Sequence, residues 1–289
     1  MSLLSYQDNS LFEKTITLID SCFPGIKDLA ENCNKIGIRW QDNSKPFCIL
    51  NAQQRLLAHL GAIDFPLIIN GKSYCFLALH AICTQLEHRN QGHFHSLMQE
   101  ALKFSDLHYA GCFLFTESPN LYTRFGFRTI LEYKFKWHRQ SMPSRASFPV
   151  KILNFKEKED VDFLISLLKR RIPISKRFGI TNEVNVSIFN LYGKELYYSE
   201  ELDLILRYII EENTVVIYDI ISTHYCAIDD ILKKFNLASY SQITFCFQPD
   251  QWEIPKTVLA EAYEDPCKFM LRTQMNFNYP FMVPTTSRC

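Results

Sequence analysis

The sequence has no apolar run near the length of a membrane span. A spanning helix needs about 20 consecutive apolar residues, and no segment of the 289 residues approaches that length. The segment from Met1 to Asp8 lacks both the positive start and the long apolar stretch of a secretory signal. We therefore expect a soluble protein of the cytoplasm that has no membrane partner.

An excess of charge of one sign is also missing. Lys and Arg together number 31, Asp and Glu together number 31, and the formal net charge is zero. Nucleic-acid-binding domains usually carry a net positive charge or a basic stripe. The composition therefore gives no reason to expect a nucleic-acid partner.

Paired cysteine motifs and metal-ligand sets are absent too. The ten cysteines include no C-x-x-C pair, so we expect reduced thiols rather than a disulfide framework. His93 and His95 are two residues apart on a predicted helix, where their side chains diverge. No cysteine or carboxylate completes a ligand set around them, and we expect no metal site.

The chain is long enough for two domains. It has 289 residues, of which 47% are hydrophobic, so a large core can be buried. The segment from Gln140 to Ser147 is small and polar, which is typical of a linker. We predict a first domain over residues 1–138, a linker over 139–149 and a second domain over 150–289.

Hydrophobic periodicity predicts the same order of elements in both halves. In the first half it indicates a helix over 10–23, strands over 47–50 and 56–62, a hairpin of 65–69 with 74–84, a helix over 91–104, and strands over 110–116 and 133–137. In the second half it indicates a helix around 161–168, a hairpin of 203–210 with 214–222, a helix around 228–235, and strands over 243–247 and 269–275. The fold class is therefore α/β, with mixed (α+β) sheets.

One loop has the chemistry of an anion site. Residues Arg89 to Phe94 lie between the strand over 74–84 and the N-terminus of the helix over 91–104. The first N–H groups of a helix have no partner within the helix, and its dipole favours negative charge. Arg89 adds a fixed positive charge, and Gly92 allows close approach of the backbone. This loop suits a pyrophosphate.

The loop also fits a known pattern. Arg89-x-x-Gly92-x-Phe94 resembles the R/Q-x-x-G-x-G/A motif of the GNAT N-acetyltransferases, although Phe94 stands where that family prefers Gly or Ala. A second resemblance is the aromatic segment Leu121 to Phe127, which follows the next strand. Residues 8–138 therefore resemble a GNAT domain. The whole chain loosely resembles the two-GNAT enhanced-intracellular-survival type, with a degenerate second GNAT-like domain and without the sterol-carrier-like domain.

The resemblance implies a division of roles. The backbone of Asn90, Gln91, Gly92, His93 and Phe94, with Arg89, would hold the pyrophosphate of acetyl-CoA. The strand end at Cys83, Thr84 and Gln85 would offer main-chain groups to the pantetheine arm, and Asn120 would add a contact. Tyr122 matches the tyrosine that protonates the departing sulfur. For the base, the sequence leaves three groups open: His80, which can equally be a structural histidine of the sheet, Glu87 near the loop, and the C-terminal carboxylate of Cys289.

The second half lacks a matching loop. Its corresponding segment, Ser222 to Asp230, has no Arg-x-x-Gly and places Asp229 and Asp230 in the first helical turn. Carboxylates there stabilise the helix N-terminus and repel phosphate. We therefore expect one cofactor site in the chain and a second half that walls the acceptor cleft.

These observations favour an acetyl-CoA-dependent N-acetyltransferase that transfers the acetyl group directly to an amine. An alternative is a GNAT-fold protein that binds CoA or regulates without catalysis, and Phe94 is the residue that favours it. A third hypothesis is an interaction scaffold whose second domain docks a protein. The sequence leaves open the acceptor amine, small molecule or protein, and the oligomeric state.

Overall fold

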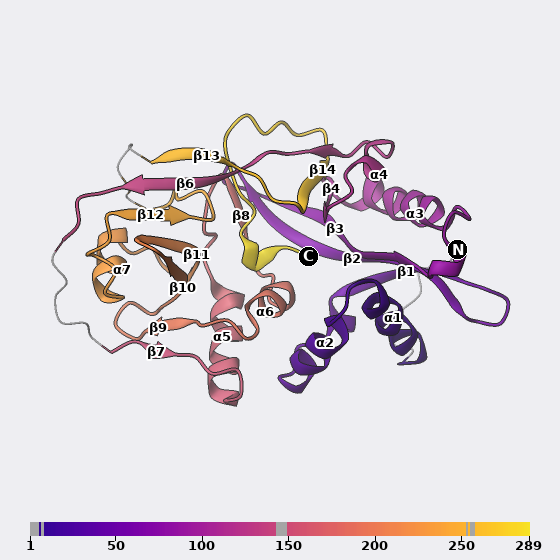
Figure 1. Ribbon diagram of the computed structural model, residues 1–289, viewed down its shortest axis with the longest axis horizontal. Coiled ribbons are helices and arrows are strands. Elements are labelled where there is room, and N and C mark those ends of the chain that lie inside the picture. Colours follow the sequence, from indigo (N-terminus) through magenta and orange to yellow (C-terminus); the bar gives the residue numbers. More distant parts are fainter. Residues whose placement is uncertain (1–5, 7–8, 143–148, 253, 255–257) are drawn as a thin grey trace.

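The computed structural model describes residues 6, 9–142, 149–252, 254 and 258–289. Two seven-stranded mixed sheets lie side by side along the long axis of the molecule, and the C-terminus lies between them (Figure 1). None of the helices in these residues is long and apolar enough to cross a membrane.

The first sheet is built around a long hairpin. Its order is β1-β2-β3-β4-β14-β5, and β8 also pairs with β2. Asn70 and Gly71 form the turn of the hairpin with φ angles of 49° and 75°, the left-handed pair that a two-residue turn of type I′ requires. The strands are β1 (Ser44–Leu50), β2 (Leu56–Ile69), β3 (Lys72–Thr84), β4 (Cys112–Thr116), β5 (Arg128–Thr129), β8 (Phe178–Ile180) and β14 (Lys268–Arg272).

Helices cover both faces of this sheet. The helix α3 (His93–His108) buries Leu97, Met98 and Ala101 against one face, which is the stripe that the sequence predicts. The helices α1 (Asn9–Cys22) and α2 (Ile26–Lys35) lie on the opposite side (Figure 1). The short elements of this half are the 3-10 turns Trp40–Asp42 and Leu86–His88 and the helix α4 (Asn120–Thr123).

The second sheet repeats the order of the first. A hairpin of β10 and β11 is followed by α7 and then by β12, which runs parallel to β11, as β4 runs parallel to β3. The repeated hairpin–helix–strand order is therefore confirmed. The sheet order is β13-β6-β12-β11-β10-β9-β7. Its strands are β6 (Glu132–His138), β7 (Lys151–Ile152), β9 (Tyr197–Ser199), β10 (Leu204–Glu211), β11 (Thr214–Ser222), β12 (Gln242–Phe245) and β13 (Leu259–Tyr263).

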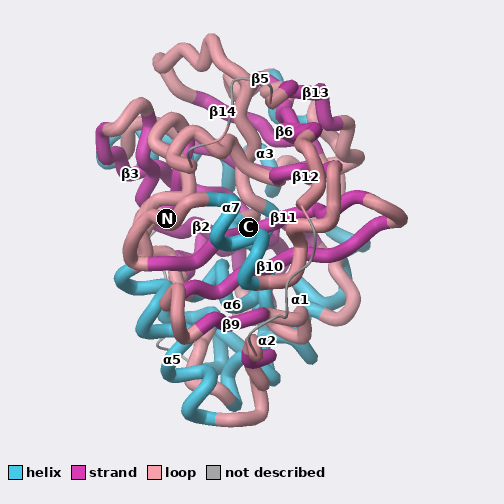
Figure 2. Tube along the Cα trace, turned by 90° about the vertical axis from the view of Figure 1, so that its left-hand side faces the viewer, coloured by secondary structure: helices cyan, strands magenta, loops and turns pink. Residues whose placement is uncertain are grey.

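Helices of the two halves meet on one side of the strands. The second half contributes α5 (Lys158–Arg170), α6 (Asn185–Leu191), α7 (Ile228–Lys234) and the 3-10 turn Thr285–Ser287. The helix α2 packs against α6, and both lie with α5 in the lower part of the molecule in Figure 2, where β9 runs among them. The sequence analysis missed α2 and α6.

The two sheets exchange strands across the predicted linker. The strand β6 precedes the linker but pairs with β12 and β13 of the second sheet. The strands β14 and β8 follow it but pair with β4 and β2 of the first sheet. The predicted linker at 139–149 therefore does not separate the strands of one sheet from those of the other. The division of the chain into two domains stays a prediction. Residues 143–148 of the predicted linker lie outside the described residues.

Candidate functional site

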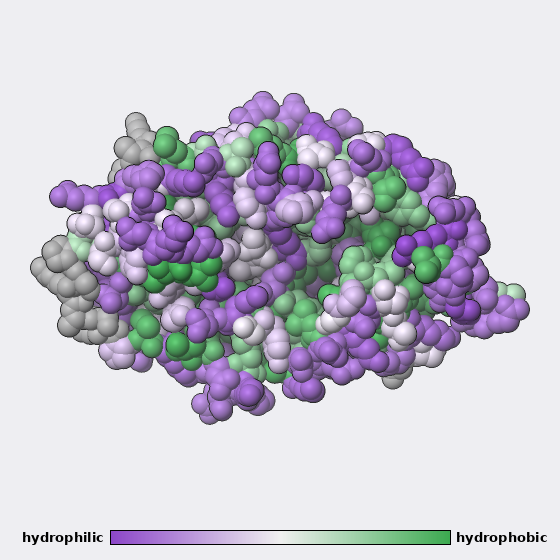
Figure 3. Space-filling view, in the orientation of Figure 1, coloured by the Kyte–Doolittle hydropathy of each residue, from purple (hydrophilic) through white to green (hydrophobic). Residues whose placement is uncertain are grey.

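The two central strands of the first sheet separate soon after they meet. The strands β3 and β4 pair only at Leu77↔Cys112 and Ala78↔Phe113, although β3 continues to Thr84 and β4 to Thr116. A cavity of about 720 Å³ is lined there by residues 79–82 of β3 and 114–116 of β4. In the space-filling view the surface is hollowed near its centre, and hydrophobic residues gather on the walls of the hollow (Figure 3).

A bulge in β3 turns its chain at this cavity. His59 pairs with Cys83 but Gly61 pairs with His80, so Ala81 and Ile82 have only one residue of β2 opposite them. Ala81 has a φ of 48°, an unfavourable angle for a residue with a Cβ. Such bulges re-aim side chains beside functional sites. Here both bulged residues line the cavity.

His59 holds the bulge from behind. Its Nδ1 lies 2.9 Å from the carbonyl oxygen of Ala81, and its Nε2 lies 2.5 Å from the Tyr6 hydroxyl. The imidazole is fully buried, and this burial lowers its pKa to about 4. A neutral imidazole therefore supports the strained turn at Ala81.

His80 lines the cavity and is also held by the sheet. Its Nε2 lies 2.9 Å from the Ser44 hydroxyl, and its ring lies 4.6 Å from the Trp40 ring. Gly61 makes room for it, because a Cβ at that position would lie 2.4 Å from Nε2. Burial, with the nearby His59 as a second cause, lowers the pKa of His80 to about 3. The side chain is therefore neutral at pH 7.

Tyr122 lies on the other side of the same cavity. The short helix α4 carries it, and 8% of the residue is exposed. Burial raises the pKa of its phenol, and a hydrogen bond with Thr116 opposes that shift. Of the four residues that the sequence analysis named for catalysis, His80, Tyr122 and Cys289 line the cavity and Glu87 does not.

The ring of Phe94 packs into an aromatic cluster. It meets the Tyr122 ring edge-on at 5.5 Å and the Phe125 ring at 5.6 Å. Edge-to-face pairs at this spacing are favourable. Phe94 therefore supports Tyr122 rather than occupying the space in front of the loop.

The loop before α3 has the geometry of an anion cradle. Gly92 caps α3 with a φ of 84°, and Asn90 has a φ of 61°. A Cβ at Gly92 would meet nothing within 4 Å, and the first turn of α3 contains no acidic residue. The exposed Arg89 bonds the carbonyl of Thr84 at 3.3 Å. Successive backbone N–H groups, open space and a cation together suit a phosphate group.

The cofactor residues named from the sequence lie beside the cavity and do not line it. Cys83 is buried, and burial raises the pKa of its thiol. The expectation for Gln85 needs correction, because its backbone N–H already bonds the carbonyl of Leu57 at 2.9 Å. The bulged residues Ala81 and Ile82 border the cavity instead. This bulge could not be predicted from the sequence, because it contains no glycine.

The other residues named for cofactor binding, which also lie outside the cavity lining, are Thr84, Arg89, Asn90, Gln91, Gly92, His93, Phe94 and Asn120.

The end of the chain is fixed at the cavity. Arg288 bonds Glu132 at 2.9 Å and Asp265 at 3.0 Å, and its carbonyl accepts a bond of 2.7 Å from the Asn190 side chain. Cys289 lines the cavity, and burial raises the pKa of its thiol. Glu87 is engaged elsewhere, in an ion pair with Arg55 at 2.5 Å.

The second half forms one wall of the cavity. Val186, Phe189 and Asn190 of α6 line it. These residues could not be found from the sequence, because no local pattern shows which distant sheet a short helix packs against. At the start of α7, Asp229 and Asp230 occupy the first turn as predicted. Asp229 is bonded by the buried Arg139 at 2.9 Å.

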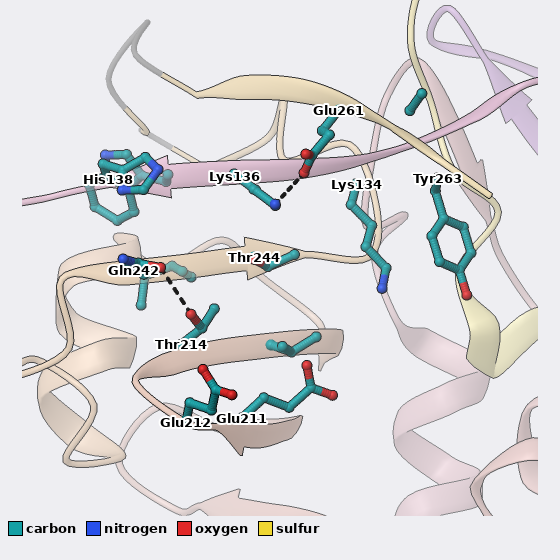
Figure 4. A pocket seen from close by; sticks show the side chains of 14 residues that line it. Lys134, Lys136, His138, Glu211, Glu212, Thr214, Gln242, Thr244, Glu261 and Tyr263 are labelled. Atoms are coloured by element: carbon teal, nitrogen blue, oxygen red, sulfur yellow. Dashed lines mark hydrogen bonds and ion pairs between the residues drawn. The ribbon is translucent and has the colours of Figure 1, made fainter. Parts of the chain in front are cut away.

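A second cavity, of about 730 Å³, lies on the outer face of the second sheet. Two of its charged side chains pair with each other, Lys136 with Glu261, and Lys134 lies over the Tyr263 ring (Figure 4). None of the residues named for catalysis or cofactor binding lines it. The first cavity is therefore the candidate site.

Comparisons with known proteins agree with this geometry. Residues 6–130 match the family model described as acetyltransferase (GNAT) domain. No curated protein matches the chain. Three similar solved structures are a probable N-acyltransferase from Enterococcus faecalis V583 (15% identity, TM-score 0.59), Eis1 from Mycobacterium abscessus (12%, 0.56) and a GCN5-related N-acetyltransferase from Kribbella flavida (13%, 0.53). Each alignment covers 94% of this chain; it covers 72% of the first two structures and 70% of the third. These similarities show that the fold extends over both halves.

Proposed function

We propose that the protein transfers an acetyl group from acetyl-CoA directly to an amine, since residues 6–130 match the model of a GNAT acetyltransferase domain. One observation carries the proposal. Tyr122 and His80 line a single cavity that opens where β3 and β4 separate. The anion cradle at Gly92 lies beside that cavity, at the start of α3.

The cradle and the parted strands support CoA as the acyl donor. Backbone N–H groups at the start of α3, with Arg89, would bind the pyrophosphate. The strand β3 pairs with β4 only at residues 77 and 78, so its edge beyond Ala78 can bind an extended arm as an added strand would.

Tyr122 is the proton donor in this proposal. The amine nitrogen attacks the acetyl carbonyl carbon, the C–S bond breaks, and the phenol gives its proton to the departing sulfur. The pKa of Tyr122 is raised, so this transfer is favourable only as negative charge develops on sulfur in a site with little water.

His80 serves the acceptor side. The nitrogen becomes acidic as its lone pair enters the new C–N bond, and it must then lose a proton. His80 is neutral at pH 7 because its pKa is about 3, so it can accept a hydrogen bond from the nitrogen. With so low a pKa it does not retain the proton, which passes on to water.

The raised pKa values of three thiols at the site support direct transfer over a covalent acyl-enzyme. The thiolate is the nucleophilic form of cysteine. Burial raises the pKa of Cys83 beside the site and of Cys267 and Cys289 in the cavity lining. These thiols are therefore poor nucleophiles at neutral pH.

The cradle is tested by a charge reversal with a matched control. Gly92→Glu places a carboxylate at the proposed pyrophosphate position, and we expect acetyl-CoA affinity to fall by about 100-fold or more, measured by calorimetry. Gly193 is also exposed and left-handed, with a φ of 72° and open space around it. Gly193→Glu imposes the same backbone strain far from the cradle, so it should keep the affinity.

Arg89→Ala should weaken binding by about tenfold, whereas Arg170→Ala, at the exposed end of α5, should not. Tight acetyl-CoA binding in both loop variants would reject the cradle. Binding of CoA with no acetylated product from any amine would instead favour the non-catalytic alternative.

A further inference from the structure

The lining of the cavity points to the chemical class of the acceptor. We propose that the acceptor is a monoamine with an aromatic or alkyl body, not a polyamine or a polycationic sugar. This inference rests on the proposed acetyl transfer and specifies its second substrate.

Apolar side chains surround the place where the acceptor must enter. The helix α1 contributes Ile19, the bend after it contributes Phe23, and α2 contributes Ile26 and Leu29. Apolar walls hold a ligand by removing its hydrocarbon surface from water, about 25 cal/mol per Å². A ligand that approaches between α1, α2 and α6 therefore gains affinity from a hydrocarbon body.

An aromatic wall stands next to His80. The Trp40 ring lies 4.6 Å from the His80 ring and 5.5 Å from the Phe189 ring, in both cases edge-on. Trp40 belongs to the first half of the chain and Phe189 to α6 of the second, and both line the cavity. An amine positioned at His80 therefore has its carbon skeleton against these rings.

Charges that could hold further cations are scarce. Among the described residues that line the cavity, Glu117 is the only acidic side chain, and it is exposed. Arg288 is neutralised by Glu132 and Asp265. Moving a second ammonium group into this cavity removes its water and offers as anionic partners only the exposed Glu117 and the C-terminal carboxylate of Cys289, which leaves the transfer costly. The lining thus discriminates against polycations.

The opening is apolar as well. Phe23 and Leu121 both line the cavity, yet 45% of Phe23 and 50% of Leu121 are exposed. Large apolar side chains left exposed around a cavity are typical of a binding site for an apolar ligand.

A matched pair of amines tests the inference. Hexylamine and 1,6-diaminohexane differ only in a second amino group, and 2-phenylethylamine adds an aromatic body. With acetyl-CoA and the full chain, we expect kcat/KM for hexylamine and 2-phenylethylamine to exceed that for 1,6-diaminohexane by about tenfold or more. CoA release and the mass of the product are measured together.

Two variants connect this preference to the cavity. Phe23→Asp adds a carboxylate at the rim and should shift the ratio toward 1,6-diaminohexane. Leu131→Asp should not, because Leu131 is similarly exposed (50%, against 45% for Phe23) but lies outside the lining. Phe189→Ala should raise KM for 2-phenylethylamine and leave KM for acetyl-CoA unchanged. Phe155→Ala is its control, because Phe155 packs on the same core cluster away from the cavity.

The outcomes separate the two proposals. Equal or better turnover of the diamine would overturn the monoamine inference while supporting acetyl transfer. A ratio that Phe23→Asp leaves unchanged would also overturn it. If no amine is acetylated although acetyl-CoA binds, the proposed function itself fails.

Discussion

At the scale of single residues, Tyr122 combines burial with two fixed neighbours. Its ring is held by Phe94 at 5.5 Å and by Phe127 at 6.1 Å, and its phenol has a raised pKa. The aromatic contacts depend on the ring alone, whereas proton donation depends on the hydroxyl. The two roles can therefore be separated by removing one oxygen atom.

Tyr122→Phe should lower kcat by about 100-fold and leave acetyl-CoA affinity close to that of the native protein. The packing is retained because phenylalanine keeps the ring. Steady-state CoA release and calorimetry measure the two quantities, and Tyr133→Phe, in the core of the second sheet, is the control. Unchanged turnover in Tyr122→Phe would remove the tyrosine from the chemistry.

The two buried histidines make the fold sensitive to mild acid. The pKa is about 4 for His59 and about 3 for His80, whereas both are near 6.5 in an unfolded chain. Below pH 6.5 the unfolded state therefore binds more protons. Stability is full above about pH 6.5 and is lost as the pH falls toward the folded-state values.

Between pH 7.5 and pH 5.0 we expect the free energy of unfolding to fall by about 2 kcal/mol for each of these histidines. Urea titrations at the two pH values measure it. His80→Gln cannot take up a proton, so its loss of stability over this interval should be smaller by one histidine's share. If the variant loses as much stability as the native protein between these pH values, His80 does not contribute to the loss. That result would show that His80 is protonated in the folded state as readily as in the unfolded state.

At the scale of elements, Gly61 and the bulge in β3 determine where His80 lies. Gly61→Ala would bring a Cβ within 2.4 Å of the His80 Nε2, so the imidazole must move away from Ser44. We expect kcat to fall by on the order of tenfold and stability to fall by about 1–3 kcal/mol.

A double-mutant cycle isolates the clash at Gly61. In a His80→Ala background the space is vacant, so Gly61→Ala should cost little stability there. Unfolding free energies of the four proteins measure the coupling. If Gly61→Ala destabilises both backgrounds equally, its effect does not pass through His80.

Elements that a short stretch of sequence specifies by itself were predictable. Asn70-Gly71 specifies its turn by left-handed angles, and α3 shows its buried stripe in the sequence. The helix α2 was missed although Ile26, Leu29, Ala30 and Cys33 follow a helical period, because it is only ten residues long and begins four residues after α1 ends. The bulge at Ala81 has no glycine to mark it.

The site was predictable only in part for a similar reason. Tyr122 and the loop from Arg89 to Gly92 follow a short pattern, which a sequence displays directly. Trp40 and Phe189 lie 149 positions apart, and only tertiary packing brings them together. The direction of the Phe94 ring likewise depends on tertiary packing, in this case against Tyr122 of α4. The assignment of roles to the cradle residues stays a prediction until it is measured.

At the scale of the whole molecule, a buried ion pair connects the second sheet to the C-terminal segment. Asp219 of β11 is bonded by Arg171 at 2.6 and 3.0 Å and by the Thr286 hydroxyl at 2.7 Å. Asp219 is fully buried, and Arg171 is 8% exposed. Removing one partner would leave an uncompensated buried charge.

Asp219→Asn should therefore destabilise the protein by about 3–5 kcal/mol, measured by urea unfolding. Asp162→Asn is the control, because its ion pair with Lys158 is exposed and should contribute about 1 kcal/mol or less. A small effect of Asp219→Asn would show that the C-terminal segment is held by its apolar contacts instead.

The exchange of strands between the sheets also has a consequence for synthesis. The sheet that carries the proposed active site contains β14, which is residues 268–272 and pairs with β4 along its whole length. Domains generally fold in order as the chain emerges from the ribosome. Here the edge of β4 stays unpaired until residues 268–272, more than 150 positions further along the chain, have been made. The first half therefore cannot complete its sheet before the second half has been synthesised, and the proposed site can form only once β14 is present.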